Sequence, residues 1–447
     1  MILHNLKLSW RVIGRNPFFS AVNLFGISFT IVTLLLMISF LQNQFGANKP
    51  LTEANNFLYF RQLEQKEIHT DTIWTRDTTI VDGIPVIDSS FESVDNSNWT
   101  SRSGFSKEFL QNYFSLDKMT TAEDITIIGM WSSFDLYRNN KKYNIECKYI
   151  DEQYFQIFDF EWIEGRPIQK QDIQQLEKNI VITDHLAEEL FGGSSGALGQ
   201  TIDFDNSEYK IIGVIKKAFV DNDYVLADIF APISLIEKTS DSDGHFGIFS
   251  AVLKCKNGDI ESAKTEIDHI TKSIPFIAPK QANQANFNYM KVIAYDHTHL
   301  NTLNYFYSED PKESKGKFVW LVGSLLLIFC LVPILNLINL NVSRVLDRAS
   351  EIGVRKAFGA KVSDIWKQIV FENIFLSLVG GFIGVTIALV LMYLINNSLW
   401  LYPIRLQFNG PVAFLTLIII VLIGFISGYL PAKKIAKVHI VESLKSK

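Results

Sequence analysis

The sequence predicts an α-helical membrane protein with four transmembrane helices and a large extracytoplasmic mixed α/β domain inserted between helices 1 and 2. Four apolar stretches are long enough to cross a bilayer, and most flanking segments are rich in Lys and Arg. The roughly 270 residues between the first two stretches are acidic and alternate between strand and helix patterns. A membrane protein with one large inserted domain accounts for all three observations.

The four apolar stretches define the expected spans. Of the 447 residues, 48% are hydrophobic, which is why spanning segments are sought first. A bilayer core of ~30 Å requires ~20 apolar residues in a helix. We expect transmembrane helices at 18–41, 318–342, 369–395 and 411–430. The first is too long for the apolar part of a signal peptide, and no small-residue cleavage site follows it.

Lys and Arg set the orientation of these helices. Residues 1–17, 343–368 and 431–447 together carry 14 basic residues against four acidic ones, whereas the loop 396–410 has only Arg405. The positive-inside rule then puts both termini and 343–368 in the cytoplasm and leaves 396–410 as a short external loop. We expect a multi-pass protein of the cell inner (plasma) membrane.

Residues 1–17 have the pattern of an amphipathic helix. Leu3, Leu6 and Trp10 recur at helical spacing, and Lys7 and Arg11 recur four apart on another face. A helix lying in the membrane interface would have this pattern, and so would an ordinary juxtamembrane helix, so both readings stay open.

The domain expected at 42–317 is acidic. Residues 46–317 contain 27 basic and 42 acidic residues, a balance that argues against nucleic-acid binding. Residues 47–120 are polar and show only short strand-like runs, such as "NFLYF" and "TTIVDGIPVI", whereas "NIVITDHLAEELFGG" further on predicts a strand followed by a helix capped by Thr183 or Asp184. Cys147 and Cys255 either form a disulfide or are two buried thiols.

No motif in the chain predicts catalysis. The stretch "FGGSSGALGQT" lacks the Lys of a phosphate-binding P-loop, and a turn before the next strand explains it better. The eight His show no metal-binding spacing, and no nucleophile motif is present. We therefore expect no enzyme activity, no catalytic site, and no cofactor or metal on this chain.

The expected spans contain small, kinking and ionisable residues. In the third span, Gly380 and Gly384 form a GxxxG motif, and Ser377 with Gly381 forms a second pair of small residues. Such pairs let helices approach closely, so they predict packing on a neighbour in the same chain or a dimer contact with another. Pro333 in the second span predicts a kink. Glu372 is either a functional group at membrane depth or a side chain that reaches the interface.

The charged loop at 343–368 separates the second and third spans. Glu351 and Arg355 stand at i,i+4 in the favourable order, and Gly359 is suited to a left-handed helix cap. A second helix would start near Ser363 and run into the third span. The pattern predicts two short cytoplasmic helices bent at "AFGAK", which a cytoplasmic partner could hold.

This loop and the C-terminal tail resemble one family. "ASEIGVRKAFGAKVSDIWKQIVFENIFLSLVGGFIG" and "SGYLPAKKIAKVHIVESLK" resemble the coupling segment and the ending of MacB/FtsX-type ABC transporter permeases, with Ile440 where the family usually has Pro. "YIDEQYFQIFDFEWIEGRPI", "NIVITDHLAEELFG", "ALGQTI" and "YKIIGVIKKA" look like the family's MacB-like periplasmic domain, in that order. Residues 47–120 match no part of the family pattern.

The resemblance implies a stand-alone four-helix permease subunit. Its coupling helix would contact a cytoplasmic ABC ATPase through Glu351, Ile352, Arg355, Lys356, Phe358 and Gly359. Because this sequence starts at the surface helix, we expect the ATPase, with its ATP and Mg, on a separate chain. A second permease copy or paralogue would complete a dimer, and a periplasmic adaptor and an outer-membrane channel are left open as further partners.

Two functions follow from the resemblance. In the first, ATP hydrolysis by the partner moves the periplasmic domain and drives export or extrusion of a drug, peptide or lipoprotein from the periplasm or the membrane. In the alternative, the chain is an FtsX-like transmembrane signalling module that activates an extracytoplasmic enzyme such as a cell-wall hydrolase.

Overall fold

A computed structural model describes residues 17–81, 84–129, 132–138, 140–236, 244–276, 287–306, 310–347, 354, 358–359, 361–398, 403–408 and 410–436. The chain divides into two compact units, a helical unit of Met1–Gly46 with Ser308–Lys447 and an α/β unit of Ala47–Tyr307. The interface helix expected at 1–17 lies outside the described residues except for Pro17.

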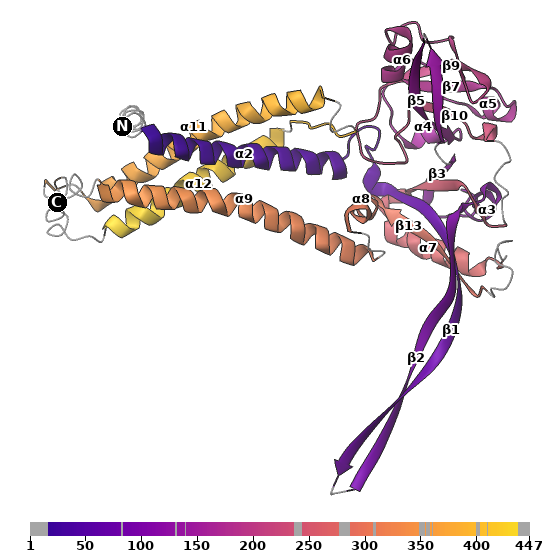
Figure 1. The fold of residues 1–447 in the computed structure, drawn as a ribbon, viewed down its shortest axis with the longest axis horizontal. Helices are drawn as coiled ribbons and strands as arrows, with labels where there is room; N and C mark the ends of the chain where they lie inside the picture. Colours follow the sequence, from indigo (N-terminus) through magenta and orange to yellow (C-terminus); the bar gives the residue numbers. More distant parts are fainter. Residues whose placement is uncertain are drawn as a thin grey trace. The chain divides into compact units, whose positions relative to one another are not determined.

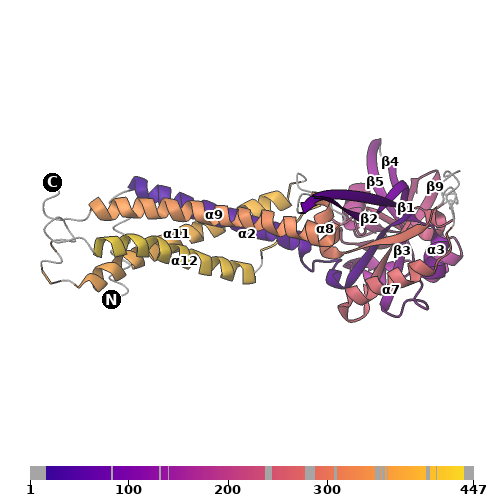
Figure 2. The same ribbon diagram turned by 90° about the horizontal axis from the view of Figure 1, so that it is seen from below.

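Four long helices make up the described part of the helical unit (Figures 1 and 2). They are α2 (Pro17–Phe45), α9 (Pro311–Asp347), α11 (Val362–Asn396) and α12 (Gly410–Ala436). The helices extend past the apolar stretches because polar residues continue the helical conformation at their ends. In α9, for example, Lys317 forms an ion pair with Glu313 one turn earlier, at 2.6 Å. The α/β unit therefore spans a shorter residue range, Ala47–Tyr307, than the expected 42–317.

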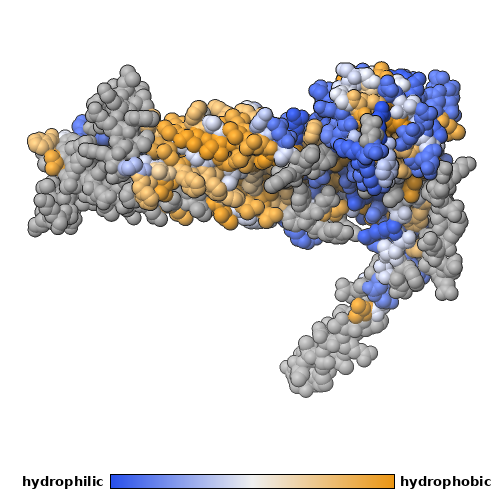
Figure 3. All heavy atoms as spheres, turned by 45° about the horizontal axis from the view of Figure 1, so that its top comes forward, coloured by the Kyte–Doolittle hydropathy of each residue, from blue (hydrophilic) through white to orange (hydrophobic). Residues whose placement is uncertain are grey.

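Apolar side chains cover the outside of this unit. Trp320 of α9 is 81% exposed and Phe382 of α11 is 77% exposed, and apolar residues of α2 and α12 are exposed as well. Figure 3 shows this hydrophobic surface in orange over the helices. Within the described residues, Ser20–Phe45 and Lys367–Asn396 have the length and composition to cross a membrane. A surface this apolar fits a lipid environment.

The α/β unit is built on one mixed sheet, with 13 strands among the described residues, in which the neighbours run β11-β2-β1-β12-β3-β5-β10-β7-β9-β6. In addition β13 pairs with β1, β4 with β5 and β8 with β9. The strands are β1 (Phe57–Val81), β2 (Ile84–Phe105), β3 (Ala122–Gly129), β4 (Ser132–Arg138), β5 (Lys141–Ile150), β6 (Trp162–Gly165), β7 (Asn179–Thr183), β8 (Thr201–Phe204), β9 (Ser207–Ile215), β10 (Ile229–Pro232), β11 (Phe246–Gly247), β12 (Phe249–Cys255) and β13 (Tyr289–Asp296).

Six α-helices and three single-turn 3-10 helices accompany the described strands. The α-helices are α3 (Lys107–Tyr113), α4 (Tyr154–Ile157), α5 (Lys170–Gln174), α6 (Asp184–Phe191), α7 (Ile260–Ser273) and α8 (His297–Phe306), and the 3-10 helices are η1 (Ala54–Asn56), η2 (Ile233–Leu235) and η3 (Lys256–Gly258). The strand-then-helix pattern expected after Asn179 is confirmed. Thr183 caps α6 by accepting from the Leu186 amide, and Gly192 ends it in the left-handed region, with φ +79°.

The sequence expectation for residues 47–120 was wrong. Instead of short strands, β1 and β2 are 25 and 22 residues long and pair continuously from Leu63–Ser103 to Val81–Ile84. Strand β13 accompanies β1 only as far as Lys66, so beyond it the two strands form a two-stranded arm (Figure 1). The polar, Thr-rich sequence gave no apolar alternation because most of the arm pairs with itself rather than covering a core.

Cys147 and Cys255 are free, buried thiols. They belong to two different apolar clusters of the α/β unit, so the disulfide alternative is excluded. Burial raises the pKa of Cys255 to about 12, so this thiol stays protonated and unreactive at neutral pH.

Glu266 of α7 ties this helix to the turn before β3. Its carboxylate accepts from the amides of Thr120 and Thr121, at 2.8 and 3.0 Å, and from both hydroxyls. Partial burial raises the pKa of Glu266, but these hydrogen bonds outweigh it and lower the pKa to about 2.

This carboxylate should make the turn pH-sensitive. Because the pKa of Glu266 is lower in the folded state, its hydrogen bonds stabilise the turn fully above about pH 4.5, the ordinary pKa of the group. This stabilisation is lost as the pH falls towards 2. We expect amide hydrogen-exchange protection of Thr120 and Thr121 to fall between pH 5 and pH 2, by about 1 kcal/mol because the carboxylate is partly solvated. The Leu186 amide, capped by the neutral Thr183 hydroxyl, is the internal control. Equal loss at both sites would contradict the assignment.

Candidate functional site

The described part of the charged loop includes an exposed aromatic residue. The Phe358 amide donates to the Val354 carbonyl at 3.1 Å, which is one helical turn, and Gly359 follows with φ +90°. Glycine is favoured there because a side chain is strained in the left-handed region. Phe358 is 89% exposed and Val354 is also exposed, so two apolar side chains of this loop are open to contact.

Only part of the expected ATPase contact can be placed. Phe358 and Gly359 lie on this turn, whereas Glu351, Ile352, Arg355 and Lys356 lie outside the described residues. An aromatic side chain held at the end of a helical turn with almost its whole surface exposed is the type of group that anchors an interface. The contact itself stays a prediction.

The glycine pair of α11 packs on α2 of the same chain. A Cβ atom on Gly380 would lie 3.0 Å from Ile27, and one on Gly384 would lie 2.8 Å from the Ser28 carbonyl oxygen and 3.0 Å from Ile31. The Ser28 hydroxyl donates to the Gly380 carbonyl at 2.8 Å. Both glycines are therefore covered within the chain and are not free for a dimer contact.

Ser377 packs on the fourth helix. A Cβ atom on Gly424 of α12 would lie 2.7 Å from the Ser377 hydroxyl, so these two small residues let α11 and α12 approach closely. Gly381, four residues after Ser377, is also buried. Pro333 lies inside α9, which the structure describes as one helix from Pro311 to Asp347, and the kink stays a prediction.

Sequence reasoning missed a polar site on α2. Asn23 is fully buried and Ser20 is 2% exposed, and neither side chain has a hydrogen-bond partner among the described residues. The signal available in the sequence was the position of Ser20 and Asn23 inside an apolar span, where burying a polar side chain costs free energy. Glu372 of α11, by contrast, accepts from the Gln368 side chain at 3.1 Å.

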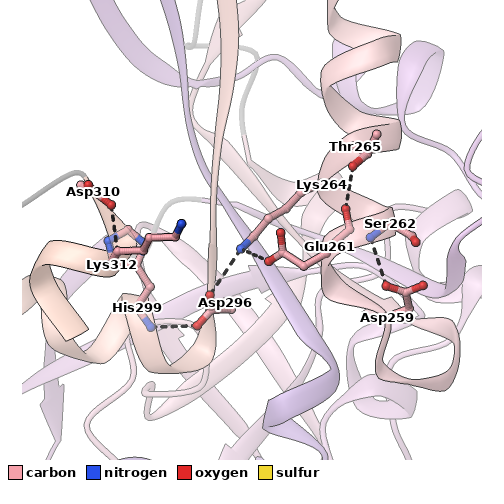
Figure 4. A network of polar contacts seen from close by, with 9 residues as sticks. All are labelled: Asp259, Glu261, Ser262, Lys264, Thr265, Asp296, His299, Asp310 and Lys312. Carbon is pink, nitrogen blue, oxygen red and sulfur yellow. Dashed lines mark hydrogen bonds and ion pairs between the residues drawn. The ribbon is translucent and has the colours of Figure 1, made fainter. Parts of the chain in front are cut away.

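A polar network stabilises the C-terminal end of the α/β unit (Figure 4). Asp296, the last residue of β13, accepts from the His299 amide of α8 at 3.0 Å and pairs with Lys264 of α7 at 3.5 Å. Lys264 also pairs with Glu261 at 3.1 Å. The network holds β13, α7 and the start of α8 together, and only residues 307–309 separate α8 from Asp310, which caps α9 through the Lys312 amide.

The Gly-rich stretch before β8 is a turn. Gly192 caps α6, and Gly196 and Gly199 have φ of +95° and +81° in the connection to β8. This confirms the expectation from the sequence. In the part of the chain that the structure describes, no group of three or more His, Cys, Asp or Glu side chains could hold a metal ion.

Two family models match the chain. The model described as MacB-like periplasmic core domain matches residues 20–270, which include most of α2 and most of the α/β unit. The model described as FtsX-like permease C-terminal matches residues 323–440, which include most of α9 and all of α11 and α12.

Curated relatives and solved structures are similar to parts of the chain. The chain is 22% identical over 299 residues to a macrolide export ATP-binding/permease protein MacB of Yersinia pestis and 24% identical over 301 residues to one of Neisseria meningitidis. Each alignment covers 66% of this chain and 42% of the relative, so the chain spans about two fifths of their length.

Among solved structures, the periplasmic region of MacB from Actinobacillus actinomycetemcomitans is 20% identical, with TM-score 0.32, covering 44% of this chain and 82% of that one. The extracellular domain of the ABC-type transporter YknZ from Gram-positive bacteria is 18% identical, with TM-score 0.31, covering 38% and 83%.

Proposed function

From the premise that the chain belongs to the MacB/FtsX-type family of ABC transporter permeases, we propose that it is a permease subunit that couples ATP hydrolysis by a partner to movement of its extracytoplasmic domain. The observation that carries the proposal is the order of the two family models: the core-domain model covers most of α2 and of the α/β unit, and the FtsX-like model follows over α9, α11 and α12.

We propose that α2, α9, α11 and α12 all span the inner membrane, with the α/β unit outside. Exposed apolar side chains on each of the four helices support this, as do the basic segments 343–368 and 431–447. The α/β unit would then lie on the external side between the first and second spans.

The energy source would be a cytoplasmic ABC ATPase that binds ATP and Mg on a separate chain. Its docking surface would be the loop at 343–368, through Phe358 and Gly359 together with Glu351, Ile352, Arg355 and Lys356. A second permease copy or paralogue would complete the assembly. Since Gly380 and Gly384 are covered by α2, that second subunit would use a different surface.

Export or extrusion is the better supported of the two functions. The names of the curated relatives describe macrolide export, and the large external unit, Ala47–Tyr307, offers more surface for handling a substrate than a signalling role would require. The FtsX-like signalling role remains the alternative, and it would be favoured if ATP turnover by the complex activated an external hydrolase without moving a substrate.

Cysteine labelling in intact cells tests the topology. Cys147 and Cys255 are buried, so replacing Cys330 by serine gives a background with little labelling. We expect a cysteine placed at Ser363 to react only after permeabilisation and one at Ser194, in the α6–β8 turn, to react from outside. External labelling at position 363 would reject the orientation.

Purification in mild detergent tests the partner. The expected result is recovery of an ABC ATPase with the chain in equal numbers, with ATP turnover that depends on both. Substrate transport by the chain in the absence of any ATPase would reject the proposal.

A further inference from the structure

The α/β unit contains a pocket of about 320 Å³ that none of the features described above uses. Helix α3 lines it with Lys107, Leu110 and Gln111, and its C-cap residue Phe114 continues the same face at i, i+3, i+4 and i+7. Helix α5 lines it with Lys170, Ile173 and Gln174, and β3 contributes Ile125 and Ile127.

The pocket is mostly apolar. Leu110, Phe114 and Ile233 are buried at its inner side, and Ile125, Ile127 and Ile173 are partly exposed to it. Partly exposed isoleucines inside a concave site leave apolar surface that an apolar ligand of this size would bury.

The strand at the pocket cannot accept another strand. The Ile127 amide donates to the Asp151 carboxylate at 2.6 Å, and the Ile125 amide donates to Asp124 at 3.1 Å. Asp151 also accepts from the Thr126 hydroxyl at 2.6 Å and the Gln153 amide at 3.2 Å. Since these two donors are occupied, an extended peptide would find no free amide at Ile125 or Ile127 to pair with.

Positive charge at the pocket is unpaired. Lys107 and Lys170 are the first residues of α3 and α5, and neither has an ion-pair or hydrogen-bond partner in the described residues. Elsewhere in this acidic unit, lysines such as Lys217 and Lys254 are paired with carboxylates. Asp151 and Glu152 are the lining carboxylates that oppose an anion, and burial raises the pKa of Asp151 to about 7, which reduces its charge at neutral pH.

We propose that this pocket binds an amphiphile with one anionic head group and a short saturated chain, with the chain over Ile125, Ile127 and Ile173 and the head near Lys107 and Lys170. A fatty-acid carboxylate and a phosphate monoester share this chemistry. Binding does not depend on transport, so the proposal holds or fails separately from the function above.

The test uses eight-carbon probes, which suit a pocket of this volume and partition weakly into lipid. The full chain in phosphatidylcholine nanodiscs is titrated with octanoate, octyl phosphate, octyl glucoside and octylammonium, with empty nanodiscs as the blank. We expect the two anions to bind more tightly than the neutral and cationic probes. The stronger of the two anions identifies the carboxylate or the phosphate as the preferred head group.

Matched variants assign the contacts. The Lys107→Gln/Lys170→Gln double variant should weaken octanoate binding about tenfold and leave octyl glucoside unchanged, because exposed charge contacts are individually modest. Glu152→Gln should strengthen octanoate binding, and Ile127→Thr should weaken all four probes. Lys118→Gln/Lys272→Gln, which removes two exposed lysines outside the pocket lining, is the control.

Three results would overturn the proposal. They are equal binding of all four head groups, octanoate binding that is unchanged in the double variant, and octanoate displacement by a short peptide with an apolar C-terminus that binds more tightly than any amphiphile. The last result would make the pocket a peptide site. Unchanged melting temperatures show that a variant has lost binding rather than its fold.

Discussion

Gly384→Leu is expected to separate α2 from α11 and to destabilise the helical unit. Even a Cβ atom at this position would lie 2.8 Å from the Ser28 carbonyl oxygen and 3.0 Å from Ile31, and both belong to a helix that cannot yield locally. Overpacking of this kind costs about 1–3 kcal/mol. Adding Gly380→Leu should also displace the acceptor of the Ser28 hydroxyl and increase the loss.

The measurement is the thermal stability of the purified chain in detergent, followed by size-exclusion chromatography. Gly323→Leu is the matched control, because Gly323 lies on α9 with no atom within 4 Å of an added Cβ. We expect the control to melt like the unmodified chain and Gly384→Leu to melt well below it. Equal melting of the two variants would show that the α2–α11 contact does not hold the unit together.

Phe358→Ala is expected to uncouple the chain from its ATPase while leaving insertion unchanged. The ring is 89% exposed, so its loss removes no internal packing, whereas a buried aromatic anchor at an interface costs roughly 2 kcal/mol or more when truncated. ATPase co-purification should fall by at least about tenfold, and transport should stop.

Two comparisons make this prediction specific. Phe414→Ala removes an exposed ring from α12, outside the loop, and should leave ATPase binding unchanged. A scrambled "EIGVRKAFGAK" segment of the same composition keeps the positive charge but loses the shape of the turn. Full coupling in the scrambled chain would reduce the loop to a topology signal.

The sequence predicted features that depend on local chemistry. The strand and helix that start at Asn179, the Thr183 cap and the Gly-rich turn before β8 were readable because each rests on residues close together in the chain. The small residues of α11 were readable as a packing surface, but their partner on α2 was not, since spacing alone says nothing of what lies opposite.

Non-local features could not be read in the same way. The arm of β1 and β2 lacks apolar alternation, so its length was missed. The pocket is lined by residues 107–127 together with residues 170–174, and Asp151, which also lines it, accepts from the Ile127 amide of β3. Neither arrangement produces a periodic pattern in the sequence from which it could be predicted.

The pairing of β1 with β13 has a consequence for how the chain folds during synthesis. Leu58 pairs with Asp296, so the first long strand of the α/β unit waits for the last one to be made. At roughly 5–20 residues per second, that delay is about 10–50 s. During it β2, which follows β1 at once in the sequence, can cover one edge of β1 from Leu63 onward. On that edge Phe57–Phe60 wait for β12, and the opposite edge stays open to wrong partners until β13 emerges.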